Sequence, residues 1–579
     1  MTTQAKSESG TKTRMSGAKA LVQSLERQKV DVIFGILGGS VLPIYDALHD
    51  STIRHILCRH EQCAAHAADG FARASGKTGV CMATSGPGAT NLVTGIATAY
   101  MDSSPIVALT GQVPTVSIDS SYMIGRDAFQ EADIIGITTP ITKYNHQVRE
   151  VAEIPRMVKT AFYVASTGRP GPVLIDIPKN VQSDMGNVEF PEKIRLLGYK
   201  PPAEPHPLQV RKAVDMLLDA ERPVILAGGG VITANASPEL AALSELLMIP
   251  VATTLMGKGA FPENHPLSVG NIGMHGTPVA NRILIESDVL LAVGTRFSDR
   301  SCATNSTFCR EAKIIHIDID AAEIEKNIDV HVPIVGDAKT ALANMYEIVC
   351  KRLRTGKNSA WTKRISEIKE QWRNNVREEN LTTLKPRDLM KELRNLLPQN
   401  AIVTTEVGQN QMWALLYFQA LKPRTFISSG GLGTMGFGFP ASLGAKIACP
   451  DRQIVDIAGD GSFIMSEQEL ACSVMENIPV TVVILNNSVL GMVAQWQRML
   501  YKKRYFAVNL GNSPDFVKLA EAYGAQGLRV QSLEEFSKAI KSAQKSEVTT
   551  VIDVPISPEE DVLPFVPPGK GLGEMIDDS

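Results

Sequence analysis

The sequence predicts an α/β fold in which three doubly wound, parallel-sheet domains follow one another along the chain. Short apolar runs rich in β-branched residues alternate with longer amphipathic or alanine-rich stretches throughout. Runs that are apolar on both faces are typical of parallel strands that helices cover on both sides. The 579 residues allow about three or four domains at roughly 150 residues each, and two irregular stretches divide them into three.

The expected strands come in three groups that helical stretches separate, as in βαβ units. They occupy residues 30–36, 105–111 and 172–178 in the first group, 222–229, 288–294 and 313–320 in the second, and 452–460 and 478–487 in the third.

The domain boundaries follow from composition. Pro and charged residues concentrate from residue 184, and a charged, helix-prone stretch begins at residue 351. Both stretches are typical of connectors. We therefore expect a disordered tail at 1–14, a first domain at 15–183, a linker at 184–204, a central domain at 205–350, a helical linker at 351–381, a third domain at 382–556 and a second tail at 557–579.

Two segments of the outer domains, 84–110 and 458–485, share one layout: the end of a strand, a glycine-containing loop, a helix, a proline and the next strand. The layout is open to two interpretations. It is common in βαβ units generally, and it would also arise from two related domains that face each other around one ligand.

Charge and hydropathy exclude several classes of protein. Lys and Arg number 58 and Asp and Glu 61, so the net charge is −3, whereas a nucleic-acid-binding protein usually carries a basic excess. No apolar run reaches the roughly 18 residues of a membrane helix, and the polar N-terminus lacks the apolar core of a secretory signal. The eight cysteines form no C-x-x-C pair, which argues against a zinc site and favours the cytoplasm, with packing roles for the thiols.

The most informative motif is Gly459-Asp460-Gly461-Ser462. Its glycines permit a tight turn at the carboxyl end of a strand, and the helix that begins near Ser462 can receive a phosphate at its N-terminus. The next strand ends at Asn487, which parallel pairing would place beside Asp460. A carboxylate, an amide oxygen, a backbone carbonyl and phosphate oxygens suit the octahedral preference of Mg²⁺. A simple βα turn with an Asp cap is the structural alternative.

This pattern resembles the diphosphate-binding motif of the thiamine-diphosphate enzymes. The resemblance implies that Asp460, Asn487 and the backbone of Val489 hold Mg²⁺ on the diphosphate. It also implies a glutamate in the first domain, and Glu61, which follows the strand-like IRHILC and opens an alanine-rich helix, matches that position. Taken alone, Glu61 is explained more simply as an acidic residue that favours the helix dipole.

The chemistry of the family gives the glutamate a role. The cofactor must lose the proton on C2, and a carboxyl group bonded to N1′ of its aminopyrimidine favours the imino tautomer whose nitrogen removes that proton. The protein supplies this geometry and the cofactor supplies the electron sink. The resemblance assigns further contacts with thiamine diphosphate to Gly408, Gln409, Asn410 (where relatives usually carry His), Gly433, Met435, Gly459, Gly461, Ser462, Gly491 and Met492.

Segments spread over nearly the whole chain from residue 15 further resemble the catalytic subunits of the acetohydroxyacid synthase family. They include TSGPGATNL (84–92), RFSDR (296–300) and GMVAQWQ (491–497). The resemblance implies that Trp496 walls the pocket for the second 2-keto acid and favours 2-ketobutyrate over pyruvate, a one-methylene choice worth about 1–3 kcal/mol. It makes Arg300 the partner of that substrate's carboxylate. Residues matching the same pocket or its entrance are Gly39, Phe129, Gln130, Lys179 and Met492.

The second domain resembles the FAD-binding domain of the same family. The GGG at 228–230 lacks G-x-G-x-x-G spacing, so the residues alone do not predict a dinucleotide site. The contacts with FAD that the resemblance implies are Arg169, Gly228, Thr254, Leu255, Met274, His275, Gly294, Arg296, Asp318 and Asp337.

The resemblance implies a transferase. Pyruvate loses CO₂, and the two-carbon unit that remains joins a second pyruvate or 2-ketobutyrate, giving 2-acetolactate or 2-aceto-2-hydroxybutyrate for branched-chain amino acid biosynthesis. FAD would be structural, because the overall reaction involves no net redox change. A homodimer or tetramer follows, since the family places Glu61 and the diphosphate site of one cofactor on different subunits. Whether a small regulatory subunit binds stays open. The alternatives are pyruvate oxidase, oxalyl-CoA decarboxylase and a non-catalytic cofactor-binding subunit, whereas Glu61 argues against a glyoxylate carboligase.

Overall fold

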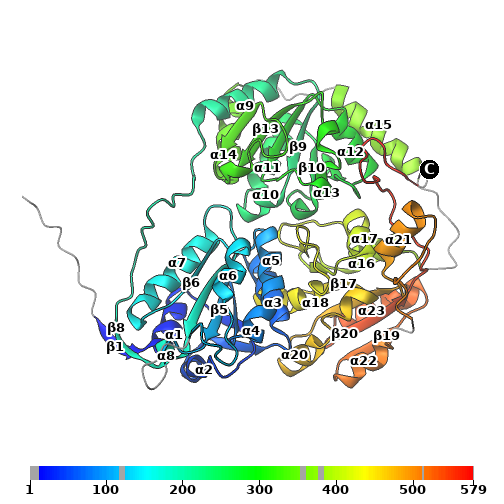
Figure 1. The fold of residues 1–579 in the computed structure, drawn as a ribbon. Helices are drawn as coiled ribbons and strands as arrows, with labels where there is room; N and C mark the ends of the chain where they lie inside the picture. The colour runs from blue at the N-terminus through cyan, green and yellow to red at the C-terminus, as the bar shows by residue number, and fades with distance from the viewer. Residues whose placement is uncertain (1–11, 117–123, 353–359, 376–383, 512–513, 578–579) are drawn as a thin grey trace, which may run out of the picture. The chain divides into compact units, whose positions relative to one another are not determined.

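Three six-stranded parallel sheets and one two-stranded antiparallel sheet form the framework of the protein (Figure 1). The computed structural model describes residues 12–116, 124–352, 360–375, 384–511 and 514–577. These residues form two compact units. The first comprises the chain up to Lys200 together with Leu443–Ala448, and the second comprises Pro201–Ser442 and the chain from Cys449 onward.

The sheet of the first unit has the strand order β3-β2-β4-β5-β7-β6. Its strands are β2 (Val32–Gly35), β3 (Arg54–Leu57), β4 (Gly79–Ala83), β5 (Ile106–Gln112), β6 (Tyr144–Gln147) and β7 (Val173–Pro178). The helices are α1 (Gly17–Arg27), α2 (Leu42–His49), α3 (Glu61–Ser75), α4 (Pro87–Asn91), α5 (Val93–Met101), α6 (Ile134–Thr138), α7 (Ile154–Ser166) and α8 (Lys179–Ser183).

The central sheet has the order β11-β10-β9-β12-β13-β14. Its strands are β9 (Pro223–Ala227), β10 (Val251–Thr253), β11 (Ser268–Asn271), β12 (Val289–Val293), β13 (Lys313–Asp318) and β14 (Val332–Val335). The helices are α9 (Pro207–Asp219), α10 (Gly229–Thr233), α11 (Ser237–Leu247), α12 (Pro278–Ile285), α13 (Asp299–Cys302), α14 (Ala338–Arg352) and α15 (Ala360–Asn375).

Strand β9 shows why such runs are apolar on both faces. Val224 and Leu226 belong to one buried cluster, and the alternate residues Ile225 and Ala227 belong to another. Successive strand residues point to opposite faces of a sheet, so helices must cover both faces of the central sheet.

The third sheet has the order β16-β15-β17-β18-β20-β19. Its strands are β15 (Ile402–Thr405), β16 (Phe426–Ser428), β17 (Ile454–Gly459), β18 (Thr481–Asn486), β19 (Gln526–Arg529) and β20 (Thr550–Pro555). The helices are α16 (Pro386–Leu396), α17 (Gln409–Tyr417), α18 (Gly438–Ala448), α19 (Asp460–Phe463), α20 (Glu469–Met475), α21 (Gly491–Leu500), α22 (Phe516–Ala522) and α23 (Leu533–Ala543).

All eight strands expected from the sequence are present, within a few residues of the expected bounds. Numbered within each sheet, the strands of the first and third sheets follow one order, 2-1-3-4-6-5, whereas the central sheet follows 3-2-1-4-5-6. The matching segments 84–110 and 458–485 therefore lead into the fourth strand of equivalent sheets, which favours related outer domains over a chance likeness of βαβ units.

Both connectors are more ordered than the sequence suggests. Thr13 and Arg14, expected in a disordered tail, belong to β1 (Thr13–Ser16), which pairs antiparallel with β8 (Met185–Val188) inside the expected linker; residues 1–11 lie outside the described part of the chain. In the expected helical linker, Trp361, Ile365 and Ile368 of α15 are buried in the core of the central sheet. Residues 353–359 and 376–383 of that region are not among the described residues.

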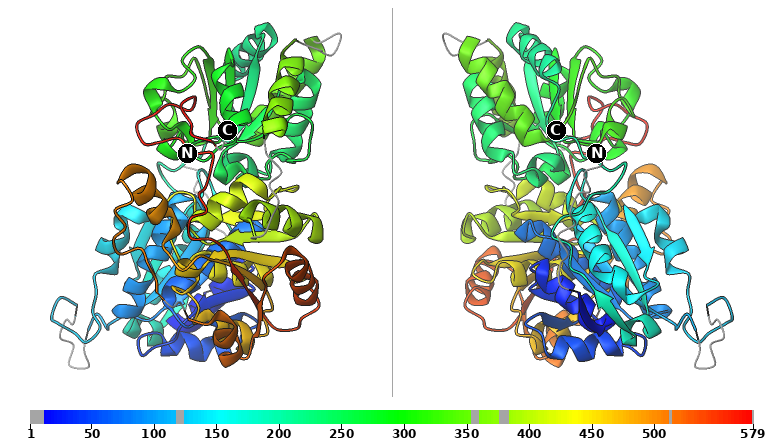
Figure 2. Two further views of the ribbon diagram at one scale, coloured as in Figure 1. Left: turned by 90° about the vertical axis from the view of Figure 1, so that its right-hand side faces the viewer. Right: turned by 90° about the vertical axis from the view of Figure 1, so that its left-hand side faces the viewer.

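The C-terminal tail (residues 557–577) runs from the third sheet to the central sheet, as the dark red trace in Figure 2 shows. The Val566 amide donates to the Met274 carbonyl, and the Thr304 hydroxyl donates to the Lys570 carbonyl, each at 2.8 Å. Phe565 is fully buried. The tail is therefore an ordered part of the second unit.

A buried ion pair also joins the central and third sheets. Lys258 Nζ donates to Glu263 at 2.7 Å and to the Leu415 carbonyl, at the end of α17, at 2.9 Å. Glu263 in turn accepts the Ala420 amide at 2.6 Å. The side chains of Lys258 and Glu263 are 1% and 8% exposed, so every charge in this contact is buried and paired.

Within the described ranges, no helix has both the length and the apolar character needed to cross a bilayer.

Candidate active site

Asp460 and Asn487 follow neighbouring parallel strands of the third sheet. Gly459, the last residue of β17, pairs with Leu485 of β18, so the two strands end together. Asp460 opens α19 and is 2% exposed, and its Oδ2 atom has no hydrogen-bond partner among the described residues. Burial raises the pKa of Asp460 to about 6, opposed by nearby backbone amides. A buried carboxylate oxygen without a partner fits a site built for a cation.

Asn487 follows β18 at the same edge of the sheet as the Asp460 turn. Its Nδ2 donates to Gln409 Oε1 at 3.1 Å, and its Oδ1 accepts the Val489 amide at 3.2 Å. An amide oxygen has two lone pairs, so Oδ1 retains capacity for a metal ion. The donor set of Asp460 and Asn487 is hard and oxygen-rich, which suits Mg²⁺.

Glu406, at the end of β15, holds the surrounding loops. One carboxylate oxygen accepts the Ser462 hydroxyl at 2.6 Å and the Gly436 amide at 2.8 Å, and the other accepts the Phe439 amide at 3.0 Å. The side chain is fully buried, and burial raises the pKa of Glu406 while these donors oppose the shift. Asp456, on β17, has a pKa raised well above its usual value by burial and by the neighbouring Glu406 carboxyl.

Met435 lies on the loop that Glu406 secures. It is half-buried and stands between Gly433 and Gly436, whose φ angles of 71° and 85° favour glycine. The loop therefore presents one large apolar side chain on a tightly turned backbone, the arrangement expected of a support for a bent cofactor.

The structure differs from the expectation for Asn410. Its Nδ2 donates to the carbonyl oxygens of Glu406 and Ile457 at 2.9 and 2.8 Å. Both amide hydrogens therefore join the ends of β15 and β17, and neither is left to donate to a diphosphate. The Gln409 amide is likewise held inside the protein, by Asn487, Gln495 and the Glu560 carbonyl.

Glu61 is the first residue of α3 in the first unit. His60 caps the helix, because its side chain accepts a hydrogen bond from the Gln62 amide at 3.1 Å. The Glu61 carboxyl is therefore not needed as the helix cap. Glu61 is 9% exposed, and its Oε2 accepts Asn91 Nδ2 at 2.9 Å. A Cβ atom on Gly88 would lie 3.2 Å from Oε1, so a larger residue there would crowd the carboxyl group.

The other site candidates of the first unit lie on its loops and helix ends. Phe129 is 88% exposed, Gln130 has a φ of 61°, and Lys179 opens α8 directly after β7. Gly39 has open space where a Cβ would be. Arg169 donates through Nε to the Ser103 hydroxyl at 2.8 Å.

Arg300, Met274 and Trp496 lie together in the second unit. The Arg300 guanidinium is 3.2 Å from the Met274 sulfur and 6.0 Å from the centre of the Trp496 ring. Trp496 lies on α21, and its buried Nε1 has no partner among the described residues. Met492, on the same helix, packs half-buried against the core of the third sheet. A cation, a thioether and an indole thus converge from three segments.

The central sheet reverses its strand order between β9 and β12, and Gly228 and Gly294 follow these two strands. A Cβ on Gly228 would lie 2.1 Å from the Gly294 carbonyl. The order 3-2-1-4-5-6 is typical of dinucleotide-binding sheets, which bind their ligand at this reversal. The fold therefore favours a dinucleotide site that the local glycine spacing did not predict.

The remaining residues proposed from the sequence to contact FAD lie on elements and loops around the central sheet. Thr254 accepts the Gly257 amide at 3.1 Å, Asp318 accepts the Asp320 amide at 2.8 Å, and Asp337 accepts the Thr340 amide at 3.0 Å. Leu255 begins a 3₁₀ turn after β10, and Arg296 follows β12. His275 stacks on Phe565 of the tail at 5.3 Å.

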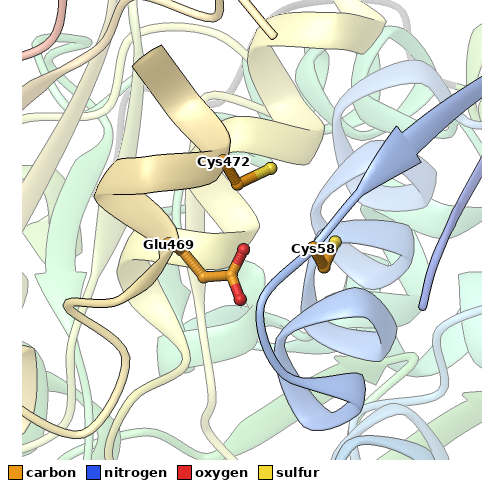
Figure 3. Close-up of side chains that lie close together, drawn as sticks. All are labelled: Cys58, Glu469 and Cys472. Atoms are coloured by element: carbon orange, nitrogen blue, oxygen red, sulfur yellow. The ribbon is translucent and has the colours of Figure 1, made fainter. Parts of the chain in front are cut away.

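The cysteines fit packing roles. Cys58 directly follows β3, Cys472 lies with Glu469 on α20, and Figure 3 draws these side chains. Six of the eight cysteines are buried, and burial raises the pKa of Cys81 and of Cys309 to about 12. Such thiols stay protonated and unreactive at neutral pH.

Three stretches of the chain match the domains of one enzyme class. Residues 15–137 match the N-terminal thiamine pyrophosphate (TPP)-binding domain of thiamine pyrophosphate enzymes, residues 210–345 match their central domain, and residues 406–554 match their C-terminal TPP-binding domain. The chain thus has the three domains of a thiamine-diphosphate enzyme.

Comparison with curated proteins shows which group of thiamine-diphosphate enzymes the chain is similar to. The probable acetolactate synthase large subunits of Methanocaldococcus jannaschii and Methanococcus aeolicus are 52% and 50% identical, each alignment covering 97% of this chain and 95% of the relative. The acetolactate synthase large subunit of Corynebacterium glutamicum is 47% identical over 97% of this chain and 90% of its own. The chain belongs to the acetolactate synthase large-subunit family.

Sequence reasoning missed Glu406, Asn91 and Gln495. Glu406 directly precedes the Val407-Gly408 segment, and Asn91 lies within the TSGPGATNL segment, so adjacency to recognised motifs was the available signal for both. Gln495 is a fully buried glutamine on α21. Nothing in its local sequence shows which distant groups satisfy it.

Proposed function

We propose that the protein decarboxylates pyruvate and joins the remaining two-carbon unit to pyruvate or 2-ketobutyrate, using thiamine diphosphate and Mg²⁺. The observation that carries the proposal is the Asp460–Asn487 pair at adjacent strand ends, with a buried Asp460 oxygen that lacks a partner among the described residues. Asp460, Asn487 and the Val489 backbone would hold Mg²⁺. Bound thiamine diphosphate supplies an electron sink for the decarboxylation.

The residues of the first unit support a proton-transfer role for Glu61. Asn91 holds one carboxyl oxygen, and His60 performs the helix capping that would otherwise compete for the group. The other oxygen is left to face a cofactor nitrogen. Glu61 would share a proton with N1′ of the aminopyrimidine, which is the acid–base work the cofactor needs.

The Arg300–Trp496 pair supports a site for the second 2-keto acid. An arginine suits the carboxylate of such a substrate, and the indole offers an apolar wall for its alkyl group. The side chain of Arg300 is 57% exposed, so it is open to an incoming anion. Gly39, Phe129, Gln130, Lys179 and Met492 are proposed to line the same pocket or its entrance.

FAD is proposed for the central sheet because Gly228 and Gly294 follow the two strands between which the strand order reverses, the place at which dinucleotide-binding sheets hold their ligand. It would stabilise the protein without exchanging electrons in the overall reaction. We further infer a homodimer or tetramer, on the resemblance that assigns Glu61 and the diphosphate site of one cofactor to different subunits.

The test is to give purified protein pyruvate with thiamine diphosphate and Mg²⁺, with and without FAD, and to identify the products. We expect 2-acetolactate and CO₂, and a mixed product when 2-ketobutyrate is added. Hydrogen peroxide with acetyl phosphate would indicate pyruvate oxidase instead. Cofactor binding without turnover would support a non-catalytic subunit. Glu61→Gln is the matched inactive control, since it keeps the shape of the side chain and removes its acid–base function.

A further inference from the structure

A continuous chain of side-chain amides connects Asn487 with the C-terminal tail. Asn487 Nδ2 donates to Gln409 Oε1 at 3.1 Å, and Gln409 Nε2 donates to Gln495 Oε1 and to the Glu560 carbonyl at 2.9 Å each. Gln495 closes the chain on Val562, accepting its amide at 2.8 Å and donating to its carbonyl at 3.0 Å. Asn487, Gln409 and Gln495 are all buried; these three side chains are called the amide chain below.

The backbone of the tail determines which way every amide in the chain points. The N–H of Val562 can only donate and its carbonyl can only accept, so Gln495 must present Oε1 to the first and Nε2 to the second. The Glu560 carbonyl likewise requires Gln409 Nε2. Gln409 Oε1 is then left for Asn487 Nδ2. The remaining atom of Asn487 is the oxygen, which is the atom a metal ion needs.

The tail itself is held firmly at this point. Arg498, on α21, forms an ion pair with Asp561, which lies between the two tail residues that bind the amide chain. The Tyr417 hydroxyl donates to the Leu563 carbonyl at 3.0 Å. Four consecutive tail residues, 560–563, are therefore bound by α17 and α21.

Packing alone does not require these glutamines. A buried amide is costly unless its donors and acceptors are satisfied, and an apolar residue of similar length would fill the space. The amide chain also depends on a glycine, because a Cβ on Gly491 would lie 2.0 Å from Gln409 Oε1 and 2.7 Å from Asn487 Nδ2. Glycine at the start of α21 thus permits the chain to form.

We propose that Gln409 and Gln495 are positioning residues, through which the docked tail turns the oxygen of Asn487 toward the metal site. The inference rests on the proposed function in one respect, the role of Asn487 as a ligand of Mg²⁺. By thermodynamic reciprocity, Mg²⁺ and thiamine diphosphate strengthen the docking of residues 560–563 to the same extent that docking strengthens Mg²⁺ binding.

The first experiment measures the Mg²⁺ dissociation constant of the full-length apo-protein at saturating thiamine diphosphate, by intrinsic tryptophan fluorescence. Gln495→Met keeps an unbranched side chain of the same length and removes the amide. We expect the dissociation constant to rise about tenfold or more, the usual effect of losing a group that orients a metal ligand. An unchanged constant in a folded Gln495→Met protein would overturn the proposal.

Gln497→Met is the matched control. Gln497 lies on the same helix and also binds backbone on both sides, donating to the Phe506 carbonyl and accepting its amide at 3.0 Å each. Neither of these contacts joins Gln497 to the amide chain, so we expect the Mg²⁺ affinity of Gln497→Met to match the wild type. An equal loss in both variants would overturn the proposal in favour of general destabilisation of α21.

The second experiment tests orientation directly. Asn487→Asp presents an oxygen at both side-chain positions, so a metal no longer depends on which atom faces it. In that background Gln495→Met should lose its effect on the Mg²⁺ dissociation constant. A full tenfold effect there would contradict an orienting role. If Gln495→Met fails to fold, Gln495→Glu serves instead, because it keeps the acceptor and loses the donations to the Val562 carbonyl and the Met499 sulfur.

The third experiment follows the tail itself by hydrogen exchange of the amides at 560–563. We expect slower exchange when thiamine diphosphate and Mg²⁺ are added to the wild type, and no such protection in Gln495→Met. Equal exchange in the presence and absence of both would overturn the coupling. A wild-type protein that shows no saturable Mg²⁺ binding would instead overturn the proposed function, and the proposal with it.

Discussion

The hydroxyl of Ser462 donates a 2.6 Å hydrogen bond to Glu406, which ties the start of α19 to the end of β15. The same carboxylate accepts the amides of Gly436 and Phe439. One buried side chain therefore holds the Met435 loop and the Asp460 turn in a common frame.

We expect Glu406→Ala to lower both stability and cofactor affinity, because it leaves two buried donors, the Ser462 hydroxyl and the Phe439 amide, without this acceptor, each costing about 1–3 kcal/mol. Urea unfolding of the apo-protein and calorimetric titration with thiamine diphosphate measure the two effects. Glu467→Ala is the control, since one oxygen of that half-buried glutamate has no partner among the described residues. Equal losses in both variants would refute a specific role for Glu406.

Asn91 should position Glu61 for proton transfer. Asn91→Leu removes the 2.9 Å hydrogen bond to Glu61 Oε2, and a misplaced catalytic group lowers kcat by up to about 100-fold. Steady-state acetolactate formation gives kcat, and titration gives a thiamine diphosphate dissociation constant that should stay close to the wild type. The control is Thr90→Val on the same helix, whose hydroxyl binds the Pro87 carbonyl. Wild-type kcat in Asn91→Leu would remove Asn91 from the mechanism.

Trp496→Leu should lower the preference for 2-ketobutyrate over pyruvate with Mg²⁺ binding unchanged. The indole offers apolar contact for one extra methylene, a difference of about 1–3 kcal/mol, and the Arg300 guanidinium lies over it, 6.0 Å from the ring centre. The measurement is the ratio of the two products when both 2-keto acids compete. Trp372→Leu, in half-buried packing on α15, is the control. A product ratio that does not move would exclude Trp496 from the pocket.

Gly491→Ala should weaken Mg²⁺ binding even though alanine favours helices. Its Cβ would lie 2.0 Å from Gln409 Oε1 and 2.7 Å from Asn487 Nδ2, so the amide chain must move. We expect the Mg²⁺ dissociation constant at saturating thiamine diphosphate to rise about tenfold or more, and urea unfolding of the apo-protein to show a loss of about 1–3 kcal/mol from the crowded site. Gly511→Ala, where a Cβ meets no atom within 4 Å but the φ of 69° strains alanine, is a control for backbone strain outside the amide chain. Wild-type Mg²⁺ affinity in Gly491→Ala would contradict the steric argument.

His275 should make the second unit sensitive to acid. Burial, with a further contribution from Arg300, lowers the pKa of His275 to about 4 from 6.5. The folded protein therefore favours neutral His275, and its stability falls as the pH drops from 6.5 toward 4, by at most about 3 kcal/mol. His275→Phe keeps the ring stacked on Phe565 and removes the titration. Urea midpoints between pH 7 and 4, without added flavin, should fall less in the variant; parallel curves would refute the assignment.

The strands, and the position of Asp460 and Asn487 at neighbouring strand ends, could be predicted from the sequence because both depend on local pattern. Parallel strands must end at one edge of a sheet, so Gly459-Asp460 and Asn487 were bound to meet once their strands paired. The proposed dinucleotide site of the central sheet, where the strand order reverses, could not be predicted in this way. Gly228 and Gly294 are brought together by the strand order of the central sheet, which no spacing within either glycine segment encodes.

The hydrogen bonds of Asn410 were hidden from the sequence for a similar reason. Its position in a recognised motif indicated a diphosphate contact, yet its amide bonds the carbonyls of Glu406 and Ile457. The amide chain is even harder to predict from the sequence, because Gln409 and Gln495 are 86 residues apart and Gln495 and Val562 are 67 residues apart. Buried polar groups form hydrogen bonds with whatever groups the tertiary fold brings near them. The local sequence around a helical glutamine therefore does not show which groups it will bind.

The Lys258–Glu263 ion pair has a consequence for how the protein melts. Pulling the central sheet away from α17 would take the Leu415 carbonyl from Lys258 and the Ala420 amide from Glu263. A hydrogen bond to a charged group contributes about 1.5–3 kcal/mol, and this separation would lose both bonds at once. On heating, the central and third sheets should therefore unfold together, and calorimetry should record a single peak for both.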